Sequence, residues 1–370
     1  MIARLRIFGI PKPNNVSTKT YLNTAACGLL DEGALQQTNA FYQAMLTESS
    51  TASEIVRDKR IPEIRENLAS FLGASASEIA FVPNFSYALN CIVQALKGTE
   101  KVLLFKTDYP SVYEPFRINN FDITWIEVEA DGFTINTDVL KEKLLQEKID
   151  LLVISHVQWL SGFKLNLVDI GTFCKKHKII FIVDATQSLG AIEINMGDIH
   201  ADVLIASNYK WMNAGFGTGV MYMSESFMQG YPPVIGGNNS YTIKDGIRQY
   251  VPSVRSFEPG HTNLHALLIL DATVQFKRAK GVAAIEAHNR QLTQQLLDNV
   301  PDDLLVGPKT LENRSSIVYL KADKQLQDYL TENNIVVTRL DSMVRVSMHF
   351  YNTPADVAVL TDCLKAYRIH

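Results

Sequence analysis

The chain has 370 residues, of which 46% are hydrophobic and 20% are charged, a balance typical of a globular protein with a large buried core. Its formal net charge is −4, from 35 basic and 39 acidic residues, and no basic tract is long enough to follow a phosphate backbone. These values argue against a nucleic-acid partner and leave room for two domains of ordinary size.

The sequence also gives no indication of a membrane or secreted protein. Residues 1–10 contain two arginines but too short an apolar run for a signal peptide, and no stretch approaches the roughly 20 apolar residues that cross a bilayer. The four cysteines lie far apart and none belongs to a CxxC pair: Cys27, Cys91, Cys174 and Cys363. This spacing argues against a disulfide scaffold or a zinc site and predicts a cytoplasmic protein.

Predicted helices and strands alternate between residues 61 and 224. Apolar residues recur on one helical face over 61–75, 86–98, 137–148 and 167–178, which predicts four helices. Short apolar runs predict buried strands at 78–82, 101–106, 123–129, 151–157, 179–185, 202–207 and 219–224. The alternation is typical of an α/β fold with a mostly parallel central sheet, whose ligands bind beyond the carboxyl ends of the strands.

The pattern changes near residue 263. Two long helices are predicted over 263–281 and 282–300, and shorter elements follow at 315–320, 324–334, 335–340, 344–350 and 355–368. We therefore expect a large domain over 15–262 and a smaller α+β domain over 263–370. Residues 1–14 are expected to belong to the smaller domain. Segment 232–263 is rich in Gly, Pro and Asn, which predicts a long functional loop between them.

Two charged residues stand at the predicted carboxyl edge of the sheet. Asp184 ends one predicted strand, and Lys210 closely follows another. A lysine amine forms Schiff bases with carbonyl groups, and desolvation makes it more nucleophilic. Pyridoxal phosphate requires such a lysine together with an acid that keeps its ring nitrogen protonated. The alternative is that Asp184 caps the next helix and Lys210 is a solvated loop residue.

Other polar and aromatic residues fall at the same predicted edge. A helix beginning near Ser86 would offer amides and a hydroxyl to a phosphate, although Ser86 could equally be an ordinary helix cap. Ser207 and Tyr209 add hydroxyls beside Lys210. Tyr109 and His156 also end predicted strands; Tyr109 could stack on a flat ring, and either residue could simply fill the core or a loop.

On these motifs the sequence resembles the class V aminotransferases, a branch of the fold-type I pyridoxal-phosphate enzymes that includes cysteine desulfurases, kynureninase and isopenicillin epimerase. The resemblance spans nearly the whole chain, and its motifs occur in the family's order: "YLNTAACGLL", "SHVQ", "VDATQ", "SNYK", "FEPGHTN" and "RVSMHFYNT". It implies a homodimer with active sites at the subunit interface and a small amino-acid substrate.

The resemblance also implies a role for each site residue. Lys210 would carry pyridoxal phosphate, Asp184 would face its ring nitrogen, and His156 would lie beneath the ring near Asp184. Further cofactor contacts are implied for Phe85, Ser86, Tyr109, Gln187, Ser207, Tyr209, His261 and Thr262, of which His261 or Thr262 would reach the phosphate in the partner subunit. Substrate contacts are implied for Arg345, which would hold the carboxylate, and are expected for Asn23 and Ala25. Arg339 is an extra cation close to Arg345, and it is either a solvated residue at a strand end or the site of a second substrate carboxylate. No metal is expected.

Three departures from the family pattern shape the expected reaction. Tyr109 stands where many members have a histidine, and tyrosine is a poor acid–base group at neutral pH. Trp159 replaces a small polar residue. Cysteine desulfurases carry a nucleophilic cysteine on a loop before the residue matched by Arg345, and this chain has a short segment there without one. We therefore expect an aminotransferase, with a lyase or an epimerase/racemase as the alternative, and disfavour a cysteine desulfurase. A non-catalytic ligand sensor would be expected to lack Lys210 or Arg345.

Overall fold

The computed structural model of the chain describes residues 19–250 and 253–368. Residues 1–18 lie outside this described part, so the structure does not address the expectation that residues 1–10 are too short in apolar length for a signal peptide or the assignment of residues 1–14 to the smaller domain. Within it, no helix is long and apolar enough to cross a membrane. Across the same two ranges, no group of three or more His, Cys, Asp or Glu side chains is arranged to hold a metal ion, and all four cysteines are free thiols.

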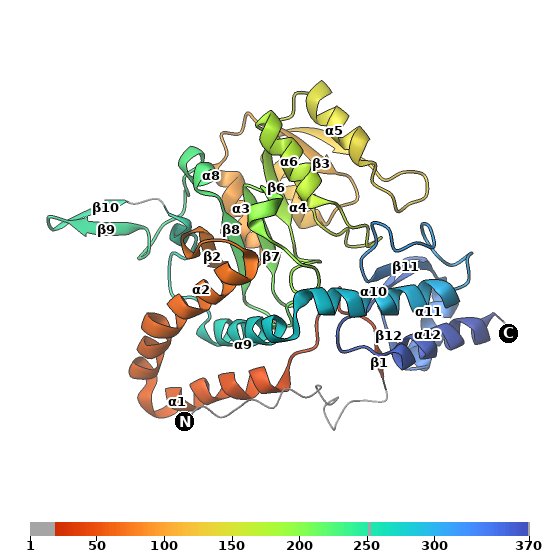
Figure 1. The fold of residues 1–370 in the computed structure, drawn as a ribbon. Helices are drawn as coiled ribbons and strands as arrows, with labels where there is room; N and C mark the ends of the chain where they lie inside the picture. Colours follow the sequence, from red (N-terminus) through yellow and green to blue (C-terminus); the bar gives the residue numbers. More distant parts are fainter. Residues whose placement is uncertain (1–18, 251–252, 369–370) are drawn as a thin grey trace.

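A seven-stranded sheet forms the centre of the larger part of the molecule (Figure 1). The strand order is β2-β8-β7-β6-β5-β3-β4, and neighbouring strands are parallel except that β8 runs antiparallel to both of its neighbours. The strands are β2 (Ile79–Val82), β3 (Lys101–Phe105), β4 (Asp122–Ile126), β5 (Leu151–Ser155), β6 (Ile180–Asp184), β7 (Val203–Ser207) and β8 (Gly219–Met223). Each overlaps a predicted strand, so the α/β fold with a mostly parallel sheet is confirmed.

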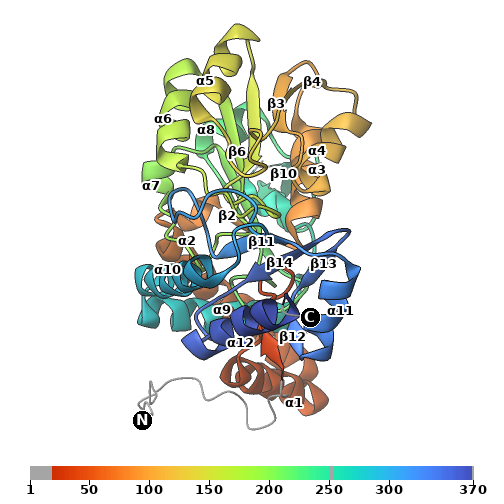
Figure 2. The ribbon, with the colours of Figure 1, turned by 90° about the vertical axis from the view of Figure 1, so that its right-hand side faces the viewer.

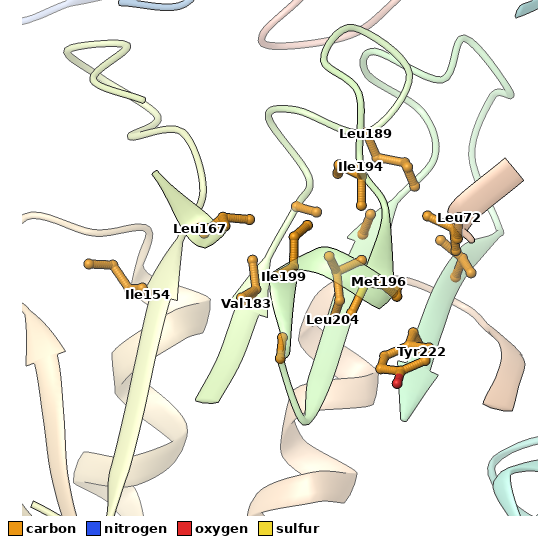
Figure 3. Close-up of a cluster of buried hydrophobic side chains, with 14 of the residues drawn as sticks. Leu72, Ile154, Leu167, Val183, Leu189, Ile194, Met196, Ile199, Leu204 and Tyr222 are labelled. Carbon is orange, nitrogen blue, oxygen red and sulfur yellow. The ribbon is translucent and has the colours of Figure 1, made fainter. Parts of the chain in front are cut away.

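Both faces of this sheet are buried under helices. Because successive strand residues point to opposite faces, Val183 belongs to one hydrophobic cluster and Ile182 to another. Figure 3 shows the first cluster, in which Val183 and Leu204 pack near Met196 and Leu72. The helices are α1 (Glu32–Ile55), α2 (Ile61–Leu72), α3 (Phe85–Ala95), α4 (Pro110–Ile118), α5 (Thr137–Gln146), α6 (Leu167–His177), α7 (Met196–Ile199), α8 (Glu225–Gly230) and α9 (Leu264–Lys280), with a π-helical turn, η1 (Val56–Arg60), between α1 and α2 and 3-10 turns η2 (Ala76–Glu78) and η3 (Val254–Phe257). Four of them, α2, α3, α5 and α6, are the helices expected between residues 61 and 178.

A second, smaller sheet lies beside the first (Figures 1 and 2). It has the antiparallel order β11-β14-β13, and next to it a short parallel pair joins β1 to β12. The elements are β1 (Thr20–Tyr21), α10 (Val282–Asn299), β11 (Ile317–Lys321), α11 (Lys324–Glu332), β12 (Ile335–Val336), β13 (Thr338–Leu340), β14 (Met343–Ser347) and α12 (Pro354–Tyr367). Leu22 and residues from α10 onward share one hydrophobic cluster, whereas α9 packs into the first cluster of the main sheet. The division at residue 263 stays a prediction.

The expectation of a loop throughout 232–263 was wrong. Residues 241–250 form a hairpin of β9 (Tyr241–Lys244) and β10 (Ile247–Tyr250) that projects from the body of the protein (Figure 1). Asp245 and Gly246 form its two-residue turn with φ of 53° and 75°. An Asp-Gly pair favours this turn because both positions require a positive φ. This Asp-Gly pair lies between two short segments that can form strands, a pattern that predicts a hairpin. We gave more weight to the Gly, Pro and Asn content of the whole segment, which predicts a loop.

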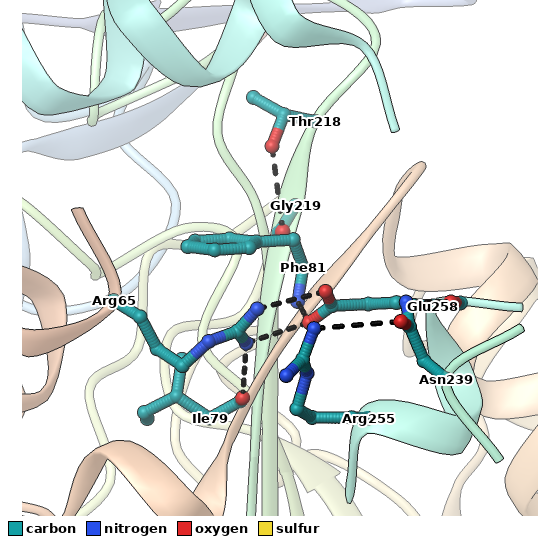
Figure 4. A network of polar contacts seen from close by, with 8 residues as sticks. All are labelled: Arg65, Ile79, Phe81, Thr218, Gly219, Asn239, Arg255 and Glu258. Carbon is teal, nitrogen blue, oxygen red and sulfur yellow. Dashed lines mark hydrogen bonds and ion pairs between the residues drawn. The ribbon is translucent and has the colours of Figure 1, made fainter. Parts of the chain in front are cut away.

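A buried ion pair holds the chain after this hairpin against β2 (Figure 4). The Arg65 guanidinium donates to both carboxylate oxygens of Glu258, at 2.6 and 2.8 Å. Arg65 also donates to the carbonyl oxygen of Ile79, and Glu258 accepts from the backbone N–H of Phe81. Because β2 is an edge strand of the sheet, the pair satisfies backbone groups that would otherwise stay unpaired.

We expect Arg65→Met to lower the free energy of unfolding by about 3–5 kcal/mol, because it leaves the Glu258 carboxylate buried without its partner. Urea unfolding measures the change. Lys106→Met is the control, since the Lys106–Glu127 pair is 2.7 Å long but exposed on both sides, and such pairs contribute about 0–1 kcal/mol. Equal losses in the two variants would contradict this role for Arg65.

Candidate functional site

A cavity of about 500 Å³ opens at the carboxyl edge of the main sheet. Ser155 and Asp184 end β5 and β6 as register partners, so their side chains point to the same face. Ser207 ends the next strand, β7, and α3 begins beside it. The lining residues are Pro83, Asn84, Phe85, Ser86, Tyr109, Ser155, Trp159, Asp184, Thr186, Gln187, Ser207, Tyr209, Lys210, Phe216 and Gly217.

Asp184 is a buried carboxylate in this cavity. Its Oδ1 accepts a hydrogen bond of 2.8 Å from the backbone N–H of Thr186. Burial raises the pKa of Asp184, and nearby Asp108 raises it further, while the bonds from Thr186 and the charge of Lys210 oppose the rise. An ionised Asp184 would therefore be stabilised by a cation bound in the cavity.

Lys210 is the buried amine of the cavity, with 8% of the residue exposed. Its Nζ makes no hydrogen bond to any described residue and lies 5.5 and 5.6 Å from the ring centroids of Tyr109 and Tyr209. Burial lowers the pKa of Lys210, the positive charge of Arg345 adds to this effect, and Asp184 and Cys27 oppose it. A lysine with a lowered pKa has a larger nucleophilic fraction near neutral pH.

The start of α3 provides a place for an anion. Asn84 caps the helix by accepting from the N–H of Tyr87, and the N–H of Phe85 donates to the hydroxyl oxygen of Ser207 at 2.9 Å. The Ser207 hydroxyl can then donate into the cavity, as can the N–H of Ser86, which has no partner among the described residues. The Ser86 hydroxyl itself donates to Ser111 at 2.7 Å. Amides at a helix start favour a phosphate.

Gln187 and Tyr109 are held in place by their neighbours. The Gln187 amide nitrogen donates to the carbonyl of Ala25 at 3.1 Å, and its oxygen accepts from the indole of Trp211 at 2.6 Å. The Tyr109 ring meets the Trp159 ring edge to face, with 5.6 Å between centroids. These contacts make one wall of the cavity aromatic and fix an amide beside it.

The side chain of His156 does not join this group. It follows Ser155 by one residue and lines a different cavity, of about 890 Å³, together with Lys164 and Leu189. Its backbone N–H donates to the carbonyl of Asp184, but its ring Nδ1 is buried without a partner among the described residues. Burial lowers the pKa of His156 to about 3. The strand parity that brings Ser155 toward Asp184 turns His156 away.

Arg345, on β14, lies just behind the cavity wall. Its Nη1 donates to the carbonyl of Trp159 at 2.7 Å, and its Nη2 donates to the Thr338 hydroxyl at 3.2 Å. The Thr338 hydroxyl donates in turn to Asn23. Arg345 is buried, and its Nε has no partner in the described ranges. Arg345 therefore contacts Trp159, which lines the cavity, but is not itself among the lining residues.

The structure does not bring Arg339 to the site. Thr338 is the register partner of Arg345, so the next residue, Arg339, points to the other face of the small sheet. Its Nη2 donates to Asp328 of α11 at 2.5 Å, and 40% of its side chain is exposed. This exposed ion pair matches the alternative of a solvated residue at a strand end.

His261 and Thr262 are not among the residues that line the cavity of their own subunit. His261 is exposed, and its Nε2 lies 2.7 Å from the Arg57 guanidinium in the π-helical turn η1. The next residue, Asn263, lies close to Gly217 at the cavity rim: a Cβ on Gly217 would come within 2.7 Å of the Asn263 amide nitrogen. The implied contact with a partner subunit stays a prediction.

Sequence reasoning overlooked Asp108, Thr186 and Cys27. Asp108 is buried and accepts hydrogen bonds from Ser155 and from the N–H of Tyr109. Asp108 lies in the turn just after β3, and Asp184 is the last residue of β6, so the same strand-end argument could have found Asp108. The Thr186 hydroxyl accepts from the N–H of Ser207 and thereby joins the turns after β6 and β7. Cys27 lies near enough to Lys210 to oppose the lowering of its pKa, a proximity between distant segments that no local pattern indicates.

Comparison with known proteins identifies the family. The family model described as aminotransferase class-V matches residues 20–360. The chain belongs to the class V aminotransferases. Among its class V relatives, a probable cysteine desulfurase from Pyrococcus abyssi is 23% identical over 94% of this chain and 95% of that protein. A protein from Schizosaccharomyces pombe described as an uncharacterized aminotransferase is 23% identical over 83% of this chain and 82% of its own.

Solved class V structures share the fold. An apo cysteine desulfurase from Thermococcus onnurineus superposes with a TM-score of 0.82 at 22% identity and covers 94% of each chain. The cystine C–S lyase C-DES, in complex with its product cysteine persulfide, has a TM-score of 0.84 at 20% identity and covers 94% of this chain and 97% of its own. Another C-DES structure has glycine covalently linked to its pyridoxal-phosphate cofactor.

Class V enzymes depend on pyridoxal phosphate, and the cavity fits this cofactor. The unpaired Lys210 amine could bind its carbonyl carbon, and Asp184 lacks a full counter-charge of the kind that a protonated ring nitrogen supplies. Donors at Ser86 and Ser207 could take its phosphate, and Tyr109 offers an aromatic ring.

We expect pyridoxal phosphate to turn the purified protein yellow, and borohydride to fix the cofactor to the peptide that contains Lys210. The reason is the unpaired, buried amine with its lowered pKa. Peptide mass spectrometry locates the label. Lys210→Ala, the control, should abolish it; a label that persists on another lysine would overturn the assignment.

Proposed function

We propose that the protein acts on an α-amino acid with pyridoxal phosphate held by Lys210, and that its reaction is transamination. The observation that carries the proposal is the pairing of two buried charges: Lys210, with its pKa lowered, and Asp184, with its pKa raised, in one cavity of about 500 Å³. Perturbed titratable groups in one cleft are typical of catalytic sites.

Each residue has a separate task in this proposal. When bound, the cofactor supplies an electron sink for the bond broken at the substrate α-carbon. Asp184 keeps the ring nitrogen protonated, because its buried carboxylate favours a cation beside it. The Lys210 amine moves the α-proton, a task suited to a base whose pKa lies near the working pH. Ser207 and the Ser86 amide hold the phosphate, and Gln187 contacts the ring oxygen.

Arg345 would bind the substrate carboxylate. Its unpaired Nε and its planar fork suit an anion, and it keeps two hydrogen bonds that hold its position. Asn23 is linked to Arg345 through the Thr338 hydroxyl, and Ala25 is linked to the cavity through Gln187. Arg339 is left out of the proposed site, since its ion pair with Asp328 occupies it.

A second candidate reaction is elimination at a carbon–sulfur bond. Several relatives are named cysteine desulfurases, and the structurally similar C-DES is named a cystine C–S lyase. The persulfide route of desulfurases requires a mobile thiolate. Here the turn before Arg345 has only two residues, Asp341 and Ser342, between β13 and β14. This short turn supports release of sulfur without a loop cysteine, should elimination be the reaction.

The test is a screen of amino acids that follows the cofactor spectrum and the product together. Transamination is expected to produce a 2-oxo acid and to require an amino acceptor for turnover. Pyruvate with sulfide or a persulfide would support elimination instead.

Arg345→Ala should raise KM steeply for amino acids and much less for the corresponding amines. If neither product forms and the cofactor spectrum does not change, the proposal is wrong. If the protein releases sulfide from cysteine and Cys27→Ala abolishes this release, the reaction is that of a cysteine desulfurase.

We also propose that the protein is a cytoplasmic homodimer whose sites lie at the subunit interface. Free cysteines support the compartment, and the exposed position of His261 supports a contact across an interface. His261→Ala/Thr262→Ala and Lys210→Ala chains should both be nearly inactive alone. A heterodimer of the two chains should have about one working site. Each site would combine Lys210 of one subunit with His261 and Thr262 of the other, so both defects fall in one site and the other site is intact. Proven subunit exchange without recovery would refute a shared site.

A further inference from the structure

A buried lysine outside the cavity has no acidic partner in the described ranges. Lys277 lies on α9 and is 0% exposed. Its amine donates to the carbonyl of Gly190 at 3.0 Å and to the side-chain oxygen of Asn213 at 3.2 Å, and it lies 4.8 Å from the centre of the Phe350 ring. Burial lowers the pKa of Lys277 well below its usual range.

His349 lies against the same amine. Its Nε2 is 3.0 Å from the carbonyl oxygen of Trp211 and 3.1 Å from the side-chain oxygen of Asn213, while its Nδ1 faces the amide nitrogen of Asn289 at 3.3 Å. Nε2 also lies 3.2 Å from the Lys277 amine. The two oxygen acceptors near Nε2 and the amide donor near Nδ1 favour the tautomer with the ring proton on Nε2. His349 therefore donates to the chain directly after Lys210.

These contacts join three segments that each deliver a residue to the site. Gly190 belongs to the turn that contains Gln187, and Trp211 and Asn213 follow Lys210 directly. His349 continues the strand that carries Arg345. The N–H of Asn213 also donates to the carbonyl of Lys210 at 3.1 Å, which closes the turn that displays the lysine.

A purely space-filling role does not account for an amine here. Methionine has a similar length and would fill the same volume without the free-energy cost of removing an ammonium or amine from water. What Lys277 adds is two hydrogen bonds, and without them the Gly190 carbonyl and the Asn213 oxygen would lose a buried donor.

We propose that Lys277 and His349 are positioning residues that hold the turn at 210–213 against the strand of Arg345 and so fix where the Lys210 amine lies. The proposal rests on Lys210 being the reactive lysine of the proposed function. Lys277 ties that turn to the turn of Gly190 and contacts His349 at 3.2 Å, whereas His349 itself continues the strand of Arg345 and so joins that strand to the turn. The two residues should therefore give different defects when they are replaced.

Kinetics with the active amino acid give one readout. Lys277→Met should lower kcat about tenfold or more, because small misplacements of a reacting group are costly, and should change KM by less than about threefold. His349→Leu should lower kcat and also raise KM. His349→Gln keeps a side-chain N–H donor and should restore most of the activity.

Chemical labelling of the cofactor-free protein gives a readout that does not depend on activity. The acetylation rate of Lys210 by acetic anhydride, followed against pH by peptide mass spectrometry, reports the pKa of its amine. In Lys277→Met and His349→Leu, the half-labelling pH should move up by about one unit, because a released Lys210 regains water and approaches the ordinary lysine value.

Lys280→Met is the matched control. Lys280 lies on the same helix, is exposed and faces the same Phe350 ring at 5.8 Å, and the substitution is the same change of side chain. It should match the wild-type profile. Unchanged Lys210 labelling in folded Lys277→Met overturns the proposal, as does equal behaviour of His349→Leu and His349→Gln. If Lys277→Met does not fold, the His349 pair decides. Failure of the proposed function itself looks different, since wild-type Lys210 would then show neither early labelling nor a cofactor adduct.

Discussion

Two opposite charges buried in one cavity set the conditions for the rest of this structure. Taking Asp184 and Lys210 out of water is unfavourable for each of them, and only mutual attraction and well-placed hydrogen bonds reduce that cost. The parallel sheet supplies these conditions, because the ends of β5, β6 and β7 meet at one edge and direct Ser155, Thr186 and Ser207 around the pair. Two groups remain incompletely satisfied: the Asp184 carboxylate lacks a full positive counter-charge, and the Lys210 amine lacks a partner. A protonated pyridine ring would supply the charge beside Asp184, and a reactive carbonyl on that ring would bind the amine.

Sequence periodicity was sufficient for the main sheet and for the residues at its edge. Asp184, Lys210, Ser207 and Tyr109 could be placed because a buried parallel strand is a short apolar run and its polar successor lies at the carboxyl end. Side-chain direction was harder to predict. His156 is one residue beyond Ser155 and faces a different cavity, and the exact end of β5 decides which of the two points toward Asp184. A one-residue error in a strand end reverses every such assignment.

Residues that meet across the two sheets were beyond local patterns. Arg345 and Arg339 look equivalent in sequence, yet their opposite parity on the small sheet places one behind Trp159 and the other in an ion pair with Asp328. Cys27, Lys277 and His349 come from segments more than fifty residues apart and approach Lys210 or its turn only after both sheets have packed. Their roles depend on tertiary distances, which periodicity does not encode. The β9–β10 hairpin is a different case. Its Asp-Gly turn is a local pattern that predicts a hairpin, but the Gly, Pro and Asn content of residues 232–263 favoured a loop.

The earliest described residues are locked in place by the latest ones. β1 pairs with Ile335 and Val336, the N–H of Ala25 donates to Ser347, and Gly28 packs so tightly on the Lys210 carbonyl that a Cβ would lie within 2.0 Å of it. During synthesis from the N-terminus, the main sheet and its lysine can form while residues 20–28 still have nothing to pair with. Residues 20–28 can take their final place only after residue 347 has been synthesised. A product that ends before β14 would thus contain Lys210 but would lack Ser347, which holds Ala25, the residue whose carbonyl positions the Gln187 amide.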